Sequence, residues 1–410
     1  MSKKLLIIGF VWPEPKSSAA GSRMMQLISS FIEASYHITF ASACAKTDNA
    51  FDLSAMGVSQ VVIELNNSSF DEFITNLKPS VVLFDRFLIE EQFGWRVAQQ
   101  CPNAIRILDT EDLHGLRKGR ALAYKEGAAF NNSYLLNDTA KREIASIYRC
   151  DLSLIISEAE MELLQNVFKV PKSLVLYIPF MLNKINESQL KTLNDFEKRI
   201  DFISIGNFLH QPNYNAVLYL KETIWPLIRK RLPYAQLHMY GAYGSQKVTQ
   251  LNDPKNGFLV KGFADDVNRV MNEAKICLAP LQFGAGLKGK LIDAMQNGTP
   301  CVMTSVAAEG MFGTIEPNGI ITDNPEDFAL KAVELYTNAS LWEKKQKNGF
   351  KIMNERFQKD FFHKNLHLQI DEISQHLDKN RLNNFTGQML LHHRMQSTKY
   401  LSKWIEEKNK

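Results

Sequence analysis

Short apolar runs rich in β-branched residues recur along most of the chain, and an amphipathic stretch of about ten to fifteen residues follows many of them. Such runs are typical of parallel strands buried on both faces, and the stretches between them are typical of helices that cover the sheet. The alternation therefore predicts a doubly wound α/β domain over residues 1–182. Its predicted strands are Leu5–Phe10, His37–Ala43, Val61–Glu64, Val81–Asp85, Ile105–Asp109, Leu154–Ser157 and Leu174–Ile178.

The alternation stops in the polar segment Asn183–Arg199 and then resumes, which predicts a linker over 183–200 and a second doubly wound domain over 201–355. A chain of 410 residues is long enough for two domains of roughly 100–200 residues each. We expect a cleft between them, and we expect the charged helical tail 356–410 to return to the first domain. The predicted strands of the second domain are Phe202–Ile205, Leu237–Tyr240, Leu259–Val260, Ile276–Ala279, Cys301–Thr304 and Gly319–Thr322.

The composition argues against several classes of protein. A net charge of +4 over 410 residues is too weak for an electrostatic nucleic-acid surface, so we expect no nucleic-acid partner. The five cysteines have no zinc-binding spacing and indicate a reduced, cytoplasmic chain without structural metal. Lys3 and Lys4 before an apolar run superficially resemble a signal peptide, but a buried first strand explains the same run. No apolar run approaches the ~20 residues of a membrane-spanning helix, so membrane contact would be peripheral, at the inner face.

The segment Pro280–Gly298 combines two glycines and two lysines between a predicted strand and a predicted helix. Gly284 and Gly286 allow the backbone to approach a ligand closely, and the helix start with Lys288 and Lys290 attracts an anion. We interpret this segment as a phosphate cradle. Its spacing matches neither the P-loop nor G-x-G-x-x-G, so ATP hydrolysis and NAD binding are not favoured. The alternative is a tight glycine turn with solvated lysines.

Two acids near this loop favour a ligand site. Asp293 lies five residues after Lys288, where a carboxylate can accept hydrogen bonds from ribose hydroxyls, although a solvent-facing helical Asp is an equal alternative. Glu309 follows the next predicted strand, on the same edge of the sheet, and could bind sugar hydroxyls or cap a helix.

The stretch FGAGLKGKLIDAMQNGTPCVMTSVAAEGM resembles the donor-binding segment of the group 1 glycosyltransferases, the retaining family numbered four. DFISIGNFLHQPNYNAVLYLKETIWPLIRKRLPYAQLHMYG and VKGFADDV resemble other parts of that family's C-terminal domain, and ILDTEDLHGLRKGR and ISEAE resemble its first domain. The likeness runs from about residue 1 to 355 and is specific only in the second domain. It implies the GT-B fold, in which two Rossmann-like domains face each other across a cleft, with a C-terminal helical extension.

The resemblance also implies transfer of a sugar, with retention of configuration, from a UDP- or GDP-sugar to an acceptor hydroxyl. The nucleotide sugar is then a substrate, no cofactor is expected, and the acceptor is a glycan, lipid-linked or protein hydroxyl. A helix N-terminus and lysines can stabilise the leaving diphosphate without metal. Asp265 and Asp266 are placed to start a helix rather than to bind Mg²⁺.

Two motifs depart from the common family pattern. The family's paired glutamates correspond here to Ala285 and Asp293, so sugar contacts at the first position would come from the backbone of Gly284–Leu287. The arginine that often follows the first-strand glycine, Gly206, is replaced by Asn207. His210 and Asn213 follow it, and Lys288 and Lys290 become the candidates to neutralise a diphosphate.

Further site residues follow from the resemblance. Gly262 and Phe263 would hold the nucleotide base, unless Phe263 is plain core. Gly21, at a predicted helix start, would approach donor or acceptor, with Arg23 on the acceptor side; the alternative is an ordinary helix start capped by Ser17 or Ser18.

The polar segment 109–120 would face the transferred sugar and the acceptor. His114 would bind the sugar, and Asp109 or Asp112 would orient the acceptor hydroxyl. Arg117 and Arg120 would meet an anionic acceptor or form a solvated helix face.

Alternative functions remain at this point. An epimerase-like GT-B enzyme would act on the nucleotide sugar without an acceptor. A catalytically inactive GT-B binding or scaffold protein is suggested by Ala285 and Asn207. In the tail, Met395, Tyr400 and Trp404 could make weak peripheral membrane contact, or the last helix could simply dock on the first domain.

Overall fold

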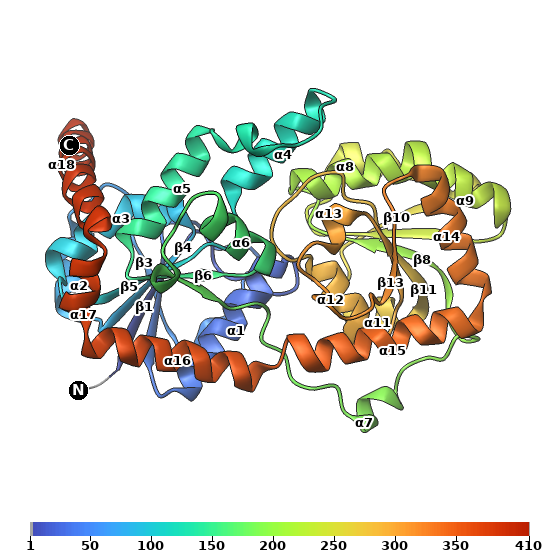
Figure 1. The fold of residues 1–410 in the computed structure, drawn as a ribbon, viewed down its shortest axis with the longest axis horizontal. Coiled ribbons are helices and arrows are strands. Elements are labelled where there is room, and N and C mark those ends of the chain that lie inside the picture. Colours follow the sequence, from blue (N-terminus) through green and yellow to red (C-terminus); the bar gives the residue numbers. More distant parts are fainter. Residues whose placement is uncertain (1–2, 410) are drawn as a thin grey trace.

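The computed structural model describes residues 3–409, apart from the side chains of residues 393–396. Within this range the chain forms two parallel sheets, of seven and six strands, as predicted (Figure 1). The strand order is β3-β2-β1-β4-β5-β6-β7 in the first sheet and β10-β9-β8-β11-β12-β13 in the second. The bounds are β1 (Lys4–Gly9), β2 (His37–Ser42), β3 (Ser59–Val62), β4 (Val81–Asp85), β5 (Ile105–Asp109), β6 (Leu152–Ile155), β7 (Val175–Tyr177), β8 (Ile200–Ile205), β9 (Leu237–Tyr240), β10 (Phe258–Gly262), β11 (Ala274–Ala279), β12 (Cys301–Met303) and β13 (Gly319–Ile321).

Helices cover both faces of each sheet (Figure 1). Around the first sheet lie α1 (Ala19–Glu33), α2 (Ser69–Leu77), α3 (Phe87–Gln100), α4 (His114–Lys125), α5 (Asp138–Arg149) and α6 (Glu158–Asn166). The linker contains α7 (Glu187–Leu190). Around the second sheet lie α8 (Gln211–Tyr219), α9 (Trp225–Arg231), α10 (Gln246–Thr249), α11 (Val267–Glu273), α12 (Gly289–Gln296), α13 (Ser305–Ala308), α14 (Pro325–Thr337) and α15 (Ala339–Arg356).

The apolar runs are continuous because both faces of each sheet are buried. In β1, Leu5 and Ile7 pack in the core cluster that contains residues of α1, whereas Leu6 and Ile8 pack in the cluster that contains residues of α2 and α3. All four side chains are buried. Successive strand residues point to opposite faces, so a strand covered on both sides needs apolar residues at every position.

The predicted linker is not wholly a surface segment. Arg199, at its end, is completely buried in the second domain, where its guanidinium donates hydrogen bonds to the carbonyl oxygens of Asn194 (2.8 Å) and Asn297 (2.7 Å). Burial lowers the pKa of Arg199 to about 10. Arg199 is buried because carbonyl groups inside the second domain accept the hydrogen bonds of its guanidinium.

The chain crosses between the domains twice, and the two crossings are hydrogen-bonded to each other. The Leu182 N–H donates to the Phe357 carbonyl at 2.7 Å, and the Lys359 N–H donates to the Leu182 carbonyl at 2.9 Å. After the second crossing, α16 (Lys359–Gln375), α17 (Leu377–Asn383) and α18 (Phe385–Lys408) run along the first domain (Figure 1).

Contacts with three parts of the first domain hold the tail. Ser30 of α1 hydrogen-bonds His363 and His367 of α16 at 2.9 and 3.1 Å. Arg381 of α17 binds Asp151 at 2.8 Å, and α18 packs against α5 and α3.

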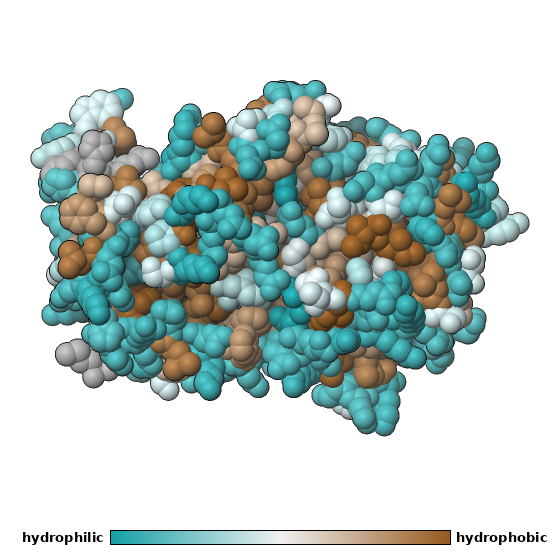
Figure 2. Space-filling model, viewed as in Figure 1, coloured by the Kyte–Doolittle hydropathy of each residue, from teal (hydrophilic) through white to brown (hydrophobic). Residues whose placement is uncertain are grey.

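The tail also carries exposed aromatic residues. Tyr400 and Trp404 are 64% and 59% exposed, while the Met395 side chain lies outside the described residues. Hydrophilic residues predominate along the lower edge of the face in Figure 2, where α15 and α16 run.

Candidate functional site

The site lies where the carboxyl end of the second sheet meets the first domain. β8 and β11 are neighbours at the point where the strand order reverses, and ligands of such sheets bind in the crevice beside that point. The turn after β8 holds Gly206, Asn207 and His210, and the turn after β11 holds 284–288. The topology thus brings together two turns that are more than seventy residues apart in the sequence.

Lys288 caps the loop that leads into α12. It lies at the N-cap of the helix and is buried, and its Nζ donates to the carbonyl oxygens of Ala285 (3.0 Å) and Gly286 (2.5 Å). Gly286 has a φ of 65°, which favours glycine. Burial lowers the pKa of Lys288 to about 8. The expected glycine loop with a lysine at a helix start is present, but the lysine is not solvated.

Lys290 joins this loop to the turn after β8. Its Nζ donates to Asn213 Oδ1 at 3.0 Å, and Asn213 Nδ2 donates to the Asn207 carbonyl at 3.0 Å. A side chain at Gly206 would meet the Asn213 amide at 2.8 Å, which explains the glycine. Burial lowers the pKa of Lys290 to about 8 and raises that of the nearby Asp293 to about 7, although Lys290 opposes the latter shift.

First-domain residues contact the turn 284–288 directly. The Gly286 N–H donates to Glu160 Oε1 at 2.7 Å, and a side chain at Gly286 would meet Asp112 Cβ at 2.9 Å. Ala285 packs in a core cluster of the first domain, and Leu287 packs with Ile156 of that domain. Burial raises the pKa of Glu160 to about 7, and the Asp112 carboxylate adds to this rise. Sequence reasoning gave Glu160 no role, although the ISEAE segment that contains it had been recognised.

Arg120 links α4 to the second domain. It makes two hydrogen bonds to the Glu309 carboxylate, at 2.6 and 2.8 Å, and a third to the Gly284 carbonyl at 2.9 Å. Burial would raise the pKa of Glu309, but the hydrogen bonds from Arg120 outweigh it and lower that pKa. Arg120 is therefore not a solvated helix residue, and in this arrangement Glu309 binds the arginine rather than a sugar. We call this contact the Arg120–Glu309 clasp.

Asp112, His114 and Arg117 gather at the start of α4. The Arg117 guanidinium lies 2.5 Å from Asp112, and His114 Nε2 lies 3.4 Å from it. Burial would raise the pKa of Asp112, but Arg117, His114 and His210 outweigh it and lower that pKa. Burial lowers the pKa values of His114 and His210 to about 4, so both imidazoles are neutral at pH 7. The structure thus brings these predicted residues from both domains together.

Glu143 of α5, another residue without a predicted role, fixes the start of α4. Its two oxygens accept hydrogen bonds from the N–H groups of His114 (2.9 Å) and Gly115 (3.0 Å). Burial raises the pKa of Glu143 to about 8, although these two hydrogen bonds oppose the shift. No local signal could have identified it, because the cap comes from a different helix.

Two predicted residues have a structural place instead. Arg23 and Asp109 are completely buried, and they bind each other at 2.8 Å. Arg23 also donates to the carbonyl oxygens of Ile178 and Pro179 at 2.6 and 3.0 Å. The expected acceptor-side cation at Arg23 and acceptor-orienting carboxylate at Asp109 are therefore corrected, because neither side chain reaches the surface.

Sequence reasoning missed two neighbouring residues, Arg86 and Glu111, which follow β4 and β5. Both have a left-handed backbone, with φ values of 72° and 62°. Non-glycine residues in this region cluster at functional sites. Burial raises the pKa of Glu111 well above its usual range, and Asp109 contributes to the same shift.

The remaining predicted residues lie on neighbouring turns. Ser18 caps α1, as one alternative predicted, and a side chain at Gly21 would meet the Glu14 carbonyl at 2.3 Å, so helix packing explains that glycine. Gly262 ends β10 with a φ of 76°. Phe263, 38% exposed, is not plain core.

Asp266 caps α11 through the Arg269 N–H at 3.1 Å, which confirms its predicted role as a helix start.

Three properties of the described residues bear on cofactors and location. In the part of the chain that the structure describes, no group of three His, Cys, Asp or Glu side chains is placed to hold a metal ion. None of the described helices is long and apolar enough to cross a membrane. The five cysteines are free thiols.

Comparison with known proteins identifies the fold and shows what the second domain is similar to. Residues 199–338 match the family described as "Glycosyl transferases group 1". No curated protein sequence matches the chain.

Similar solved structures include a sucrose-phosphate synthase from Thermosynechococcus elongatus, with a TM-score of 0.63 and 14% identity over 92% of this chain and 99% of that one. HepE of Anabaena, solved with UDP and glucose, has a TM-score of 0.65 and 13% identity over 90% and 99%. A TarM mutant of S. aureus, solved with fondaparinux, α-GlcNAc-glycerol and UDP, has a TM-score of 0.57 and 15% identity over 73% of this chain. The chain spans 58% of the length of that protein. The chain has the GT-B fold, and its second domain is similar to the group 1 glycosyltransferases over residues 199–338.

Proposed function

We propose that the chain is a retaining glycosyltransferase that takes a UDP- or GDP-linked sugar as donor, without a metal ion, and transfers the sugar to the hydroxyl of a glycan, lipid-linked or protein acceptor. The family match over 199–338 supports the transferase class. The neighbours solved with UDP support a uridine donor. Retention and independence from metal rest on the resemblance of the donor loop.

The observation that carries this proposal is the charged start of α12. Lys288 at the N-cap and Lys290, the second residue of the helix, adjoin a loop whose glycines bring the backbone close to any ligand. The helix N-terminus has positive partial charge and free N–H groups. A diphosphate leaving group gains negative charge as the sugar bond breaks, and fixed donors stabilise it at that moment.

The first domain supplies the other wall of the proposed site. His114 is neutral and lies next to Asp112, so it can exchange hydrogen bonds with sugar hydroxyls. Arg117 fixes Asp112 and thereby orients the pair. In this proposal the residues position donor and acceptor, and the leaving phosphate oxygen takes the acceptor proton.

Nucleotide binding tests the proposal most directly. The melting temperature of the purified chain is measured with UDP, GDP, ADP or NAD in the presence of EDTA, because a ligand that binds only the folded state stabilises it by mass action. We expect a shift with UDP or GDP that is reduced in Lys288→Ala and Lys290→Ala. Each variant is compared with its own melting temperature without nucleotide. Lys230→Ala, an exposed lysine of α9, is the matched control.

Turnover then separates the enzyme from its alternatives. The UDP- or GDP-sugar chosen by the binding assay is incubated with candidate acceptors, and product configuration is read by nuclear magnetic resonance. Release of nucleoside diphosphate only when acceptor is present supports transfer. Absence of a shift with every nucleotide would refute the proposal.

A second candidate is a non-catalytic binding protein, and one observation favours it. Ala285 replaces the first family glutamate and packs into the first-domain core, while the Gly286 N–H is already bonded to Glu160. A nucleotide shift without turnover on any acceptor would support this candidate.

A further inference from the structure

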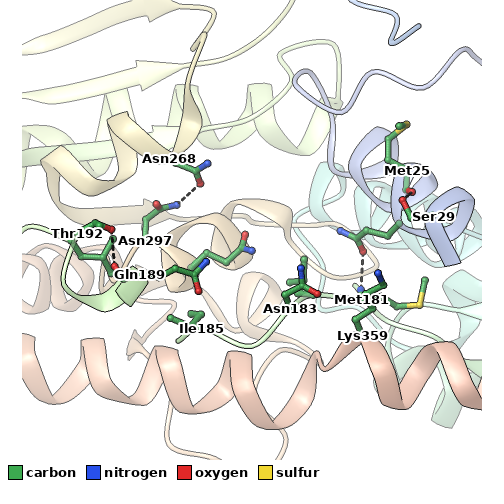
Figure 3. Close-up of a pocket in the computed structure, with 14 residues that line it drawn as sticks. Met25, Ser29, Met181, Asn183, Ile185, Gln189, Thr192, Asn268, Asn297 and Lys359 are labelled. Carbon is green, nitrogen blue, oxygen red and sulfur yellow. Dashed lines mark hydrogen bonds between the residues drawn. The ribbon is translucent and has the colours of Figure 1, made fainter. Parts of the chain in front are cut away.

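A cavity lies between the domains, beside the double crossing of the chain, and residues 206–210 and 284–288 do not line it. Its volume is about 500 Å³, within the range of roughly 300–1,000 Å³ that is common for small-ligand sites. Figure 3 shows its lining, which comes from α1, the linker, α11, the end of α12 and the start of α16. We call it the hinge cavity.

The lining of the hinge cavity has an unusual composition. Six of its fourteen residues are carboxamides, namely Gln26, Asn183, Gln189, Asn268, Gln296 and Asn297. Two more carry hydroxyl groups, five are aliphatic or thioether residues, and none is acidic or aromatic. Carboxamides both donate and accept hydrogen bonds, as hydroxyl groups do. The apolar residues, such as Met25 and Met181, offer nonpolar surface to C–H groups.

Several of these carboxamides keep hydrogen-bonding capacity. Gln26 Oε1 accepts from the Met181 N–H at 2.8 Å, and Asn268 Oδ1 accepts from Asn297 Nδ2 at 3.0 Å, as Figure 3 shows for the latter pair. The amide nitrogens of Gln26 and Asn268 are not used in these contacts. Among the described residues, no hydrogen bond engages the side chains of Asn183 or Gln296. Donors and acceptors therefore line the cavity from both domains.

The charges of the cavity argue against an ionic ligand. Lys359 is its single cation in the lining, and the lysine Nζ is paired with the carboxylate of Glu33. An anion would have to compete with that pair, and a cation would find no carboxylate. A nucleobase or other aromatic group would find no ring to stack on.

From these observations we propose that the hinge cavity is a binding site for a neutral saccharide, distinct from the donor site. Hydroxyl groups of the sugar would exchange hydrogen bonds with Asn183 and Gln296, and its C–H faces would lie on the methionine and aliphatic side chains. The proposal does not depend on the chain being a glycosyltransferase. It assigns a ligand class to a cavity that the donor-site residues do not line.

The position of this site gives it a consequence for domain movement. Met25 and Gln26 belong to the first domain, whereas Asn268 and Gln296 belong to the second. A ligand that contacts both sides binds differently when the domains move apart, so its binding is coupled to their relative position. A saccharide bound there would therefore favour the domain arrangement in which both sides contact it.

Calorimetric titration of the full chain tests this proposal. The probes are glucose, maltose and maltoheptaose as neutral sugars, gluconate and glucosamine as charged analogues, and UDP for the donor site. We expect saturable binding of at least one neutral sugar and at least tenfold weaker binding of the charged analogues. Comparison of glucose with maltoheptaose distinguishes a free small sugar from a segment of a glycan chain as the natural source.

Variants of the residues that line the cavity test where the sugar binds. Gln296→Met removes the amide with little change in volume, and loss of its hydrogen bonds should weaken sugar binding about tenfold, the factor that ~1.4 kcal/mol produces. Asn183→Leu, on the exposed linker, is a second variant that keeps the test valid if the first fails to fold. Gln246→Met, an exposed glutamine of α10, is the matched control and should bind as the wild type does.

Three outcomes would overturn the proposal. The first is no neutral sugar binding in a preparation whose fold is intact by circular dichroism. The second is equal binding by Gln296→Met, Asn183→Leu and the Gln246→Met control. The third is sugar binding that Lys288→Ala abolishes and the cavity variants leave unchanged, which would place the sugar in the donor site.

Discussion

The Arg120–Glu309 clasp should contribute measurably to the stability of the two-domain arrangement. Arg120→Ala removes the bidentate pair and the bond to the Gly284 carbonyl. A hydrogen bond to a charged group contributes about 1.5–3 kcal/mol when buried. The two side chains keep 15% and 26% of their surface exposed, so solvent screening reduces this value. We expect a coupling free energy of about 1–2 kcal/mol between the two residues.

A double-mutant cycle measures this coupling. Arg120→Ala, Glu309→Ala and the double variant are unfolded thermally in a calorimeter, where 1 kcal/mol corresponds to roughly 2–4 °C for a domain of 150–250 residues. The pair Lys331 and Glu334, exposed on α14 with 2.9 Å between charged atoms, is the matched control and should show weaker coupling because solvent screens it. Equal coupling in the two pairs would refute the reasoning that partial burial and bidentate geometry strengthen the clasp.

Two further predictions follow from the site. Gly286→Ala should lower the free energy of unfolding by more than Gly57→Ala does. Both glycines have a positive φ, which costs about 1–2 kcal/mol for alanine, but only a side chain at Gly286 would meet an atom within 3 Å, Asp112 Cβ. Equal losses in denaturant unfolding would contradict this account. Burial raises the pKa of Glu143 to about 8 in the folded chain, whereas an unburied glutamate has a pKa of 4.5. The folded chain therefore holds a proton that the unfolded chain loses, and stability falls as the pH rises from 4.5 to 8. Glu143→Gln should remove this part of the slope, and its stability relative to wild type should rise across that window; parallel pH profiles of melting temperature would argue against it.

The fold could be predicted closely from the sequence because the signal for each strand is local. Buried parallel strands need continuous apolar runs, and these runs place every strand of both sheets near its observed position. The donor loop is also local, since Gly286, Lys288 and the start of α12 lie within a few residues of each other.

Contacts between distant residues could not be predicted in this way. Glu160 meets Gly286 across 126 residues, and Arg120 meets Glu309 across 189. Each contact depends on how the two domains face each other, and neither a helical nor a strand period carries that information. The same limit explains Arg23, which lies beside a predicted loop in the sequence, while its partner Asp109 is the last residue of β5, an inner strand of the first sheet.

The double crossing has a kinematic consequence for the molecule. A single connecting segment between two domains leaves them free to rotate about the axis of that segment. Here the backbones at Leu182 and Phe357–Lys359 are bonded side by side, at 2.7 and 2.9 Å, so neither can twist without breaking the hydrogen bonds to the other. The paired backbones therefore resist rotation about their long axis and sliding along it, but they do not resist bending across it. If the domains separate, the paired crossings favour a bending movement over a twisting one.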